Sequence, residues 1–391
     1  MHLDDWDLLW SITAKAMLAA EILRPGQVVS IVPGLLSVSR KTSLVSTLRL
    51  AYGDHTAFSV VPLTFKLPEE LDAWSDWVRD HPELDSGLWM LKNNRQRGEG
   101  LRLVDTRHAF DAVWETTRRP GLEGMVLYRW YLAQQYIARP LTIAGYKFGI
   151  RVWVLVPGLN PLRVYMHTNG LALFSSHKYS MDVTAGVGGS VAPGHVTNYA
   201  QNENGRVWSL TTLRDHLPPA AWHKVWQGMM RSTSLVFAAA LPRAHEVQRQ
   251  MALPPQSCFQ FFGLDFLLDE QYAPWLLEVN ATPSMKVEHS DAATLQVIHD
   301  QKWPVVRDMV TMLRLGPERF TTGRRPVREH RGVGFMAGEL AARGGFVPLM
   351  HMFPKESPGE GLRTIPWEAT DLQMRAFVRT PAYQQAIAGH C

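Results

Sequence analysis

The sequence predicts a globular α/β protein, an α+β mixture of sheets and helices in more than one subdomain. Its 391 residues exceed what a single compact core usually organises, and 46% of them are hydrophobic against 19% charged. Apolar segments with strand character, such as 147–156, are interspersed with long helical patterns, such as 217–241. These observations together indicate several sheets and helices around separate cores.

The first part of the chain shows helical, extended and strand patterns in turn. Residues 1–68 open with a Trp- and Leu-rich helical pattern and end in Pro62–Pro68. We expect this last stretch to be an extended linker, because each proline disfavours helix at the residue before it. The elements expected next are a helix at 69–79, strands at 88–91 and 101–104, and a helix at 109–117.

The rest of the chain carries the strongest periodic patterns. The expected elements are strands at 147–156 and 163–168, a helix at 217–241, strands at 259–268 and 273–279, and a helix at 292–313. The turn at Asp269-Glu270 joins the last two strands into a predicted hairpin. The Arg- and Gly-rich tail that begins at Pro317 shows no assignable pattern.

The composition indicates in which cellular environment the protein is expected to fold and act. No window approaches the roughly twenty apolar residues of a membrane span, and the acidic start Met1–Asp5 lacks the features of a secretory signal. The two cysteines, Cys258 and Cys391, provide neither a metal-binding spacing nor a disulfide framework. We therefore expect a soluble protein in a reducing compartment. Our further expectations are a monomer and a partner that is neither a membrane nor a nucleic acid.

The net charge of +4 is mild for the size of the chain, but it is unevenly distributed. Six arginines crowd one short segment, namely Arg314, Arg319, Arg324, Arg325, Arg328 and Arg331. Such a run could contact an acidic protein tail, a nucleic acid or a membrane surface. The alternative is a solvated surface, which composition by itself favours.

The hairpin near residue 270 carries the clearest chemical signal. Side chains alternate faces along a strand, so Glu278 and Asn280 share one face of the second strand. Polar groups in an apolar strand are costly unless they contact a cation or hydrogen-bond donors. Asp265 interrupts the first strand, and the hairpin can bring it beside the other two. Three oxygen ligands on one face favour a magnesium site over the alternative, a solvent-facing edge strand.

Two cations occupy one face of the strand at 147–156. Lys147 and Arg151 lie four residues apart, whereas Phe148, Ile150 and Val152 cover the opposite face. A phosphate is the natural partner of such a pair, since arginine binds it bidentately. Side chains that reach solvent at a strand edge are an equally good interpretation of this motif by itself.

Three weaker signals accompany these two. Lys92 ends a strand before a Gly-bearing turn, which could fold over phosphates although no Walker A loop is present. The extended segment Gln134–Ile137 could offer backbone groups to an adenine edge. His195, Thr197 and Asn198 lie in one loop and could hydrogen-bond a phosphate or a carboxylate. Each of these motifs is also compatible with an ordinary surface turn or loop.

Taken in order, these segments resemble the tubulin–tyrosine ligase-like family over about residues 1 to 315. The matching segments are Trp6–Trp10, Pro62–Pro68, Trp89–Lys92, Gln134–Ile143, Lys147–Arg151, His195–Tyr199, Phe262–Asp269 and Trp275–Pro283. The last of these, with the sequence WLLEVNATP, is fairly specific by itself, and the ordered set is very specific. The tail at 320–391 matches less clearly.

The resemblance implies an ATP-grasp fold of three subdomains, with ATP held between two of them. The expected division is an N-terminal subdomain at 1–68, a central ATP-grasp subdomain at 69–143, a C-terminal catalytic subdomain at 144–316 and a basic tail at 317–391. By position, Asp265, Glu278 and Asn280 would hold magnesium. The residues that would contact ATP are Lys92, Gln134, Gln135, Tyr136, Ile137, Lys147, Arg151, His195, Thr197 and Asn198, with Lys147, Arg151 and Glu278 in catalytic roles.

The sequence departs from the family pattern at two positions. The family usually has an acid between Lys147 and Arg151, where it contacts the ribose, and this chain has Gly149. The family also usually has an arginine where this chain has Leu173. The first departure affects ATP affinity, and the second affects how a substrate carboxylate is stabilised.

The resulting hypothesis is an ATP-dependent ligase that activates a protein carboxylate as an acyl phosphate and joins an amino acid to it. The resemblance makes a tubulin tail the first acceptor and glutamate the first donor, with glycine or tyrosine as alternatives. It also implies a cytoplasmic protein associated with the cytoskeleton or cilium. The rival hypothesis, which Gly149 and Leu173 favour, is a catalytically weakened member that binds tubulin or another acidic partner.

Overall fold

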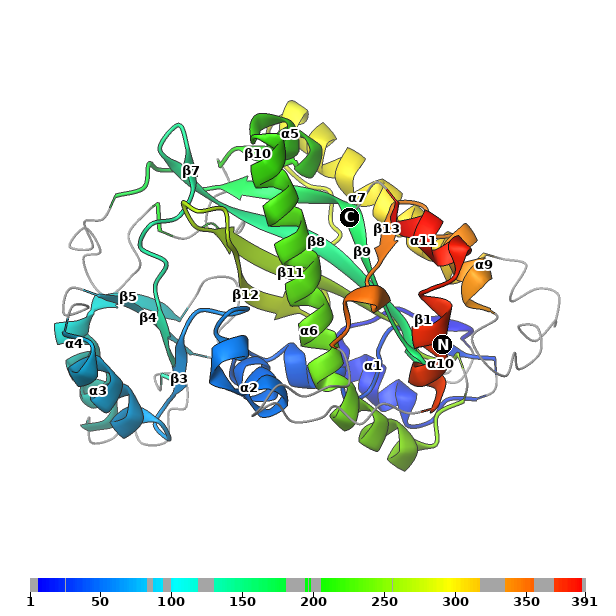
Figure 1. The fold of residues 1–391 in the computed structure, drawn as a ribbon, viewed down its shortest axis with the longest axis horizontal. Coiled ribbons are helices and arrows are strands. Elements are labelled where there is room, and N and C mark those ends of the chain that lie inside the picture. Colours follow the sequence, from blue (N-terminus) through cyan, green and yellow to red (C-terminus); the bar gives the residue numbers. More distant parts are fainter. Residues whose placement is uncertain are drawn as a thin grey trace.

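The computed structural model describes residues 6–24, 26–82, 87–93, 100–118, 130–180, 194–195, 197, 205–254, 256–316, 335–354 and 369–388. These residues form a mixed α/β fold with two main sheets (Figure 1). A small sheet with its helices lies at one end of the molecule, and the C-terminal helices lie at the other (Figure 1). Within this described part, no helix is long and apolar enough to cross a membrane.

The N-terminal elements support the large sheet. The buried hydrophobic residues of α2, including Leu44 and Leu48, pack in one core with α6 and the large sheet. The parallel pair β1 and β2 is joined to residue 258 by a single bridge from Val29. The elements are β1 (Leu8–Leu9), α1 (Thr13–Ala20), β2 (Val28–Val29), η1 (Leu35–Val38) and α2 (Lys41–Ala57).

The small sheet has four strands in the order β3-β6-β4-β5 and its own aromatic core. Phe65, Trp74 and Trp89 are buried there. The ring centroids of the two tryptophans lie 5.1 Å apart. The elements are β3 (Thr64–Lys66), α3 (Leu71–Asp80), β4 (Leu88–Lys92), β5 (Leu101–Asp105), α4 (Thr106–Arg118) and β6 (Leu132–Gln135). The predicted linker Pro62–Pro68 thus contains an edge strand, because β3 pairs with β6.

The large sheet has seven strands, with β10-β9-β8-β11-β12 in order and β7 and β13 at its edges. Strands β8 and β9 pair with each other, and the predicted hairpin of β11 and β12 is confirmed. The strands are β7 (Thr142–Ile143), β8 (Tyr146–Leu159), β9 (Leu162–Phe174), β10 (Val207–Ser209), β11 (Gln260–Leu268) and β12 (Pro274–Asn280).

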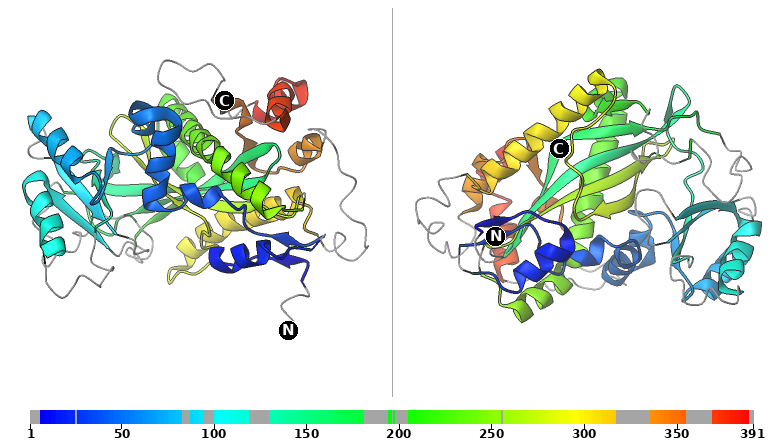
Figure 2. Two further views of the ribbon diagram at one scale, coloured as in Figure 1. Left: turned by 90° about the horizontal axis from the view of Figure 1, so that it is seen from below. Right: turned by 180° about the vertical axis from the view of Figure 1, so that it is seen from behind.

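Helices cover both faces of this sheet, as Figures 1 and 2 show. Phe148, Ile150 and Val152 of β8 share a core with α6, whereas Trp153 and Leu171 share a second core with α7. Alternation along β8 thus directs Arg151 to the α7 face. The helices are α5 (Leu210–His216), α6 (Pro219–Met251) and α7 (Ala292–Met312).

Part of the predicted tail is folded onto the large sheet. Strand β13 pairs with β9, and the buried Asp371 accepts a hydrogen bond of 2.9 Å from the Leu162 N–H. The elements are α9 (Met336–Ala341), β13 (Phe346–Pro348), η5 (Met350–Met352), α10 (Ala369–Phe377) and α11 (Pro381–Ile387). The arginines at 319, 324, 325, 328 and 331 lie outside the described residues, so their predicted role stays a prediction.

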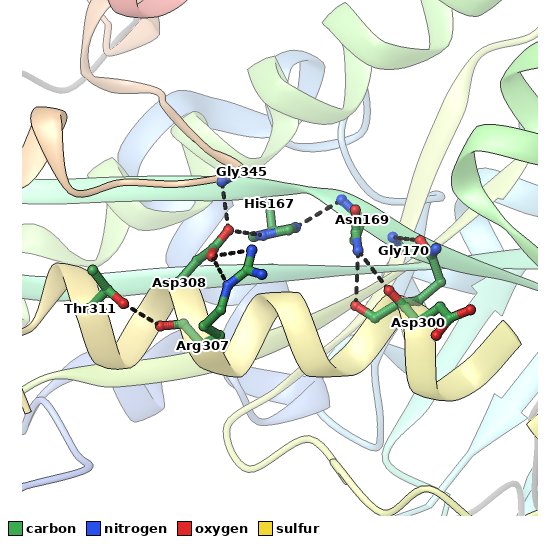
Figure 3. Close-up of polar contacts among 9 residues, drawn as sticks. His167, Asn169, Gly170, Asp300, Arg307, Asp308, Thr311 and Gly345 are labelled. Carbon is green, nitrogen blue, oxygen red and sulfur yellow. Dashed lines mark hydrogen bonds and ion pairs between the residues drawn. The ribbon is translucent and has the colours of Figure 1, made fainter. Parts of the chain in front are cut away.

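A polar cluster joins α7, β9 and the segment before β13 (Figure 3). Asp308 of α7 lies 3.3 Å from His167 Nε2 on β9, and it accepts a 2.7 Å hydrogen bond from the Gly345 N–H. Burial lowers the pKa of His167 to about 4, so the imidazole is neutral and donates its Nε2 proton to Asp308. These bonds hold α7 against the large sheet.

Replacing Glu339 with Ala should lower the free energy of unfolding by about 3 kcal/mol, because a buried ion pair that loses one partner leaves an uncompensated charge. Arg163 is 4% exposed and lies 2.9 Å from Glu339, which also accepts a hydrogen bond from Tyr165. Urea denaturation measures the change. The control is Glu246→Ala, which breaks an exposed pair with Arg243 and should cost at most about 0.5 kcal/mol. If both variants lose the same free energy of unfolding, the pair of Arg163 and Glu339 does not anchor the tail.

Candidate functional site

A cavity of about 380 Å3 opens on the α7 face of the large sheet. Its lining comes from β8, β9, β11, β12, the segment after β12, α7 and Thr197. Six charged side chains line it, namely Arg151, Asp265, Glu278, Lys286, Glu288 and Lys302. The cavity therefore brings together the three predicted hairpin residues and Arg151, one of the two cations predicted on this strand.

The hairpin register explains how the acids come together. Asp265 is the direct cross-strand partner of Glu278 on one side and of Arg151 on the other. The Arg151 NH2 group lies 2.7 Å from Asp265 Oδ2, and its Nε also donates to this carboxylate. Asn280 Nδ2 donates to the same Asp265 oxygen at 3.1 Å. The predicted convergence of Asp265, Glu278 and Asn280 is thus confirmed, whereas their role as metal ligands stays a prediction.

Glu278 is the carboxylate of this set that lacks an ion-pair partner among the described residues. Burial raises its pKa, and so does the facing Asp265, while Lys41, Lys92 and Arg151 oppose the shift. Two carboxylates directly opposite one another on adjacent strands repel. A divalent cation would remove that repulsion, and carboxylate and amide oxygens are the ligands that Mg2+ prefers. The three residues therefore fit such an ion, although the described residues hold no cluster of three His, Cys, Asp or Glu side chains.

Lysines from both sheets lie near one another, and one of them near Glu278, outside the described lining of the cavity. Lys147 of β8 is 4% exposed, and its ammonium donates 2.8 Å hydrogen bonds to Tyr136 OH and to the His195 carbonyl. Burial, together with the nearby Lys92, lowers the pKa of Lys147 to about 7. Lys92 of β4 donates to Gln134 Oε1 at 2.5 Å, and burial together with Lys41 lowers its pKa to about 8. Buried lysines whose described hydrogen-bond acceptors are all neutral suit an anionic ligand.

Lys41, the first residue of α2, was not predicted to belong to the site. Its ammonium lies 3.5 Å from the Asn93 carbonyl at the end of β4, and it is close enough to Glu278 and Lys92 to shift their pKa values. Burial lowers its own pKa. The sequence offered no signal for it, because α2 is brought to this point only by packing against α6.

The segment Gln134–Ile137, which was predicted to line the adenine, makes hydrogen bonds within the small sheet and to two lysines. Strand β6 pairs with β3 and β4, and the backbone N–H groups of Gln135 and Tyr136 donate to the Leu63 and Leu88 carbonyls. The Gln134 and Tyr136 side chains instead contact Lys92 and Lys147. Gln135 lines a small pocket together with Trp77, and neither lysine belongs to the lining of that pocket. Ile137 follows the end of β6, so its backbone is the part of the segment outside the sheet.

The predicted loop contributes two of its three residues to the described site. His195 Nδ1 lies 2.9 Å from Tyr136 OH, and the ring is 4% exposed. Thr197 lines the cavity beside Gly149, where an added Cβ atom would lie 2.8 Å from Thr197 Oγ1. Thr197 thus occupies the space that a side chain at 149 would need. Asn198 lies outside the described residues.

The two departures from the family pattern face one another. Gly149 of β8 and Leu173 of β9 are direct cross-strand partners, and both line the cavity. An acid and an arginine at paired positions would be able to neutralise each other. Their joint replacement by glycine and leucine leaves no unpaired charge, and it makes this end of the cavity apolar.

Comparison with known proteins places this chain in a family. The profile of the tubulin-tyrosine ligase family matches residues 21–314. The chain is 24% identical over 317 residues to a probable alpha-tubulin polyglutamylase, Ttll1, of Tetrahymena thermophila, covering 73% of this chain and 74% of that protein.

Two human relatives are longer than this chain. It is 25% identical to the probable tubulin polyglutamylase TTLL2 over 76% of this chain and 49% of that protein. It is 27% identical to the tubulin monoglutamylase TTLL4 over 79% of this chain, but it spans only 25% of that protein. Because the family profile covers about three quarters of the residues, the chain belongs to the tubulin-tyrosine ligase family.

Proposed function

We propose that this protein is an ATP-dependent ligase that joins an amino acid to a carboxylate of a protein, with a tubulin tail as the first acceptor to test. The observation that carries the proposal is the junction of the two sheets. There, three lysines with lowered pKa values, Lys41, Lys92 and Lys147, lie close to one another and, through Lys41 and Lys92, to the carboxylate of Glu278. Polyphosphate together with a divalent cation satisfies both sides of such a charge arrangement.

The arrangement suits an ATP-grasp mode of binding, with the nucleotide between the small and the large sheet. Lys92 and Lys147 would bind the phosphates, and the Ile137 backbone after β6 would lie near the adenine. Asp265, Glu278 and Asn280 would hold Mg2+, which would neutralise phosphate charge when bound. Arg151, fixed in place by Asp265, would stabilise the charge that develops on the transferring phosphoryl group.

The reaction would proceed in two displacements. An oxygen of the acceptor carboxylate attacks the γ-phosphorus of ATP, ADP leaves, and an acyl phosphate forms. The amine of the donor amino acid then attacks the acyl carbon, inorganic phosphate leaves, and the nitrogen loses a proton as the amide forms. No side-chain nucleophile is required, since the acyl phosphate supplies the activation. The glutamylase names of the relatives make glutamate the first donor to test, and a tubulin acceptor would place the protein with microtubules in the cytoplasm or cilium.

The pairing of Gly149 with Leu173 favours a second candidate function, namely binding of tubulin or another acidic partner without ligation. In this case the protein would bind its partner equally well with and without ATP. The retained set of Asp265, Glu278 and Asn280 argues for the ligase, because a binding protein has no need of three converging oxygen ligands.

The test is intact-mass spectrometry of tubulin after incubation with the full chain, ATP, Mg2+ and glutamate, glycine or tyrosine. We expect a mass increase of one residue or more that requires ATP. Calorimetry should show that Mg2+ strengthens ATP binding. Unchanged tubulin mass with every amino acid, together with tubulin binding independent of ATP, would establish the binding protein instead.

A further inference from the structure

One row of side chains crosses the floor of the cavity from acidic to apolar. Cross-strand pairing places Glu278 opposite Asp265, Asp265 opposite Arg151, and Arg151 opposite Leu171. Leu173, two residues further along β9, extends the apolar end. The acids therefore lie on the β12 side, and the side of the cavity nearest β9 has an apolar floor.

Helix α7 covers the β9 side and supplies a cation there. Ile298 and Lys302 of α7 line the cavity, and the half-buried Lys302 ammonium donates a hydrogen bond to the Lys286 carbonyl. Burial and the nearby Arg151 lower the pKa of Lys302 to about 8, while Glu288 opposes the shift. At neutral pH most of these side chains still carry a positive charge, and an ammonium with three donors has two left for a ligand.

Three lysine and arginine side chains line the described cavity, and two of them form ion pairs, whereas Lys302 has only the more distant attraction of Glu288. Arg151 is paired with Asp265, and Lys286 lies 3.6 Å from Glu288. In the part of the chain that the structure describes, no carboxylate forms an ion pair with Lys302. The Asp308 cluster further along α7 holds the helix against β9 (Figure 3), which keeps Lys302 over the cavity.

We propose that Lys302 binds the carboxylate of the donor amino acid, and that Leu171 and Leu173 contact its side chain, so that the donor has an uncharged side chain. The proposal rests on the proposed ligase function and narrows its donor. An amino acid with an uncharged side chain brings one carboxylate, which Lys302 can bind. The second carboxylate of glutamate would lie against leucines, where an unpaired charge is costly.

The experiment measures incorporation of glycine, alanine, tyrosine and glutamate into tubulin by the full chain with ATP and Mg2+. An uncharged donor should exceed glutamate by about tenfold or more in kcat/KM, since this ratio corresponds to a modest desolvation penalty. Lys302→Met should raise KM for that donor about tenfold or more and leave KM for ATP within about twofold. Lys302→Arg, which keeps the charge, should restore most of the loss.

The matched control is Lys224→Met, which removes an exposed lysine of α6 that donates to the Gln271 carbonyl and lies outside the described cavity lining. Its kinetic constants should equal those of the wild type. Preferred use of glutamate, with KM for glutamate unaffected by Lys302→Met, would overturn the proposal. If no amino acid is incorporated, the ligase function fails. Calorimetry with glycine, tyrosine and glutamate in the presence of Mg2+ and ATP then tests whether Lys302 binds an amino acid. Binding that Lys302→Met abolishes would support the site, and absence of binding would refute it.

Discussion

Replacing Glu278 with Gln should lower the rate of ligation roughly 100- to 1000-fold at saturating ATP, the typical loss when a charge-stabilising group is removed from a transition state. The substitution keeps the shape of the side chain and removes its charge. Because the pKa of Glu278 is already raised by burial and by the facing Asp265, the neutral amide relieves a repulsion in the free protein. The melting temperature without ligands should therefore stay the same or rise.

The measurement combines a time course of tubulin mass with thermal melting at several Mg2+ concentrations in the presence of ATP. Wild-type protein should gain stability with Mg2+ through linkage, and the variant should lose most of that gain. Glu270→Gln is the control, since it makes the same change in the turn of the same hairpin, at a side chain that is 44% exposed and paired with Arg139. Turnover near that of the wild type at limiting Mg2+ would remove Glu278 from the proposed metal site.

Replacing Lys147 with Met should weaken ATP binding roughly ten- to hundredfold, because a hydrogen bond to a charged group contributes about 1.5–3 kcal/mol. The ammonium lies between Tyr136 and His195 and has no carboxylate partner among the described residues. The fold should survive, since methionine fills a similar volume and removes a buried charge.

The same lysine should make ATP affinity depend on pH. In the free protein the pKa of Lys147 is about 7 and that of Lys92 about 8, so both are charged below pH 7. Phosphates favour the charged forms, and raising the pH from 7 to 9 should therefore weaken ATP binding, by at most about tenfold per pH unit for each lysine. Calorimetric titration at pH 6.5 and 8.5 measures the slope, which should be shallower in Lys147→Met.

The stability of the free protein should change in the opposite direction. The folded-state pKa of both lysines lies below the unfolded value of about 10.4, so the unfolded chain binds more protons between about pH 7 and pH 10. Stability without ATP therefore rises with pH over this window.

The prediction on ATP affinity has its own counter-result. If ATP affinity has the same pH slope in the wild type and in Lys147→Met, another group governs the pH dependence of ATP binding.

The sequence by itself determined the parts of the site that lie close together along the chain. Asp265, Glu278 and Asn280 belong to one hairpin, so alternation and a two-strand register suffice to predict that they meet. Lys147 and Arg151 share a face for the same reason. The family, and with it the ligase hypothesis, also followed from ordered local motifs.

Only the tertiary structure decided what depends on packing between distant segments. Lys41 lies close enough to Glu278 to lower its pKa because α2 packs against α6. Lys302 covers the β9 side because Asp308 and His167 hold α7 there. The pairing of Gly149 with Leu173 depends on the register of β8 and β9, and the position of Gln134 inside the small sheet depends on strands that precede it by up to 70 residues. Local periodicity indicates which face of an element is apolar, but the partner of that face is selected by the packing of the whole core. The charges around the cavity are therefore a property of the fold, and no single segment carries them.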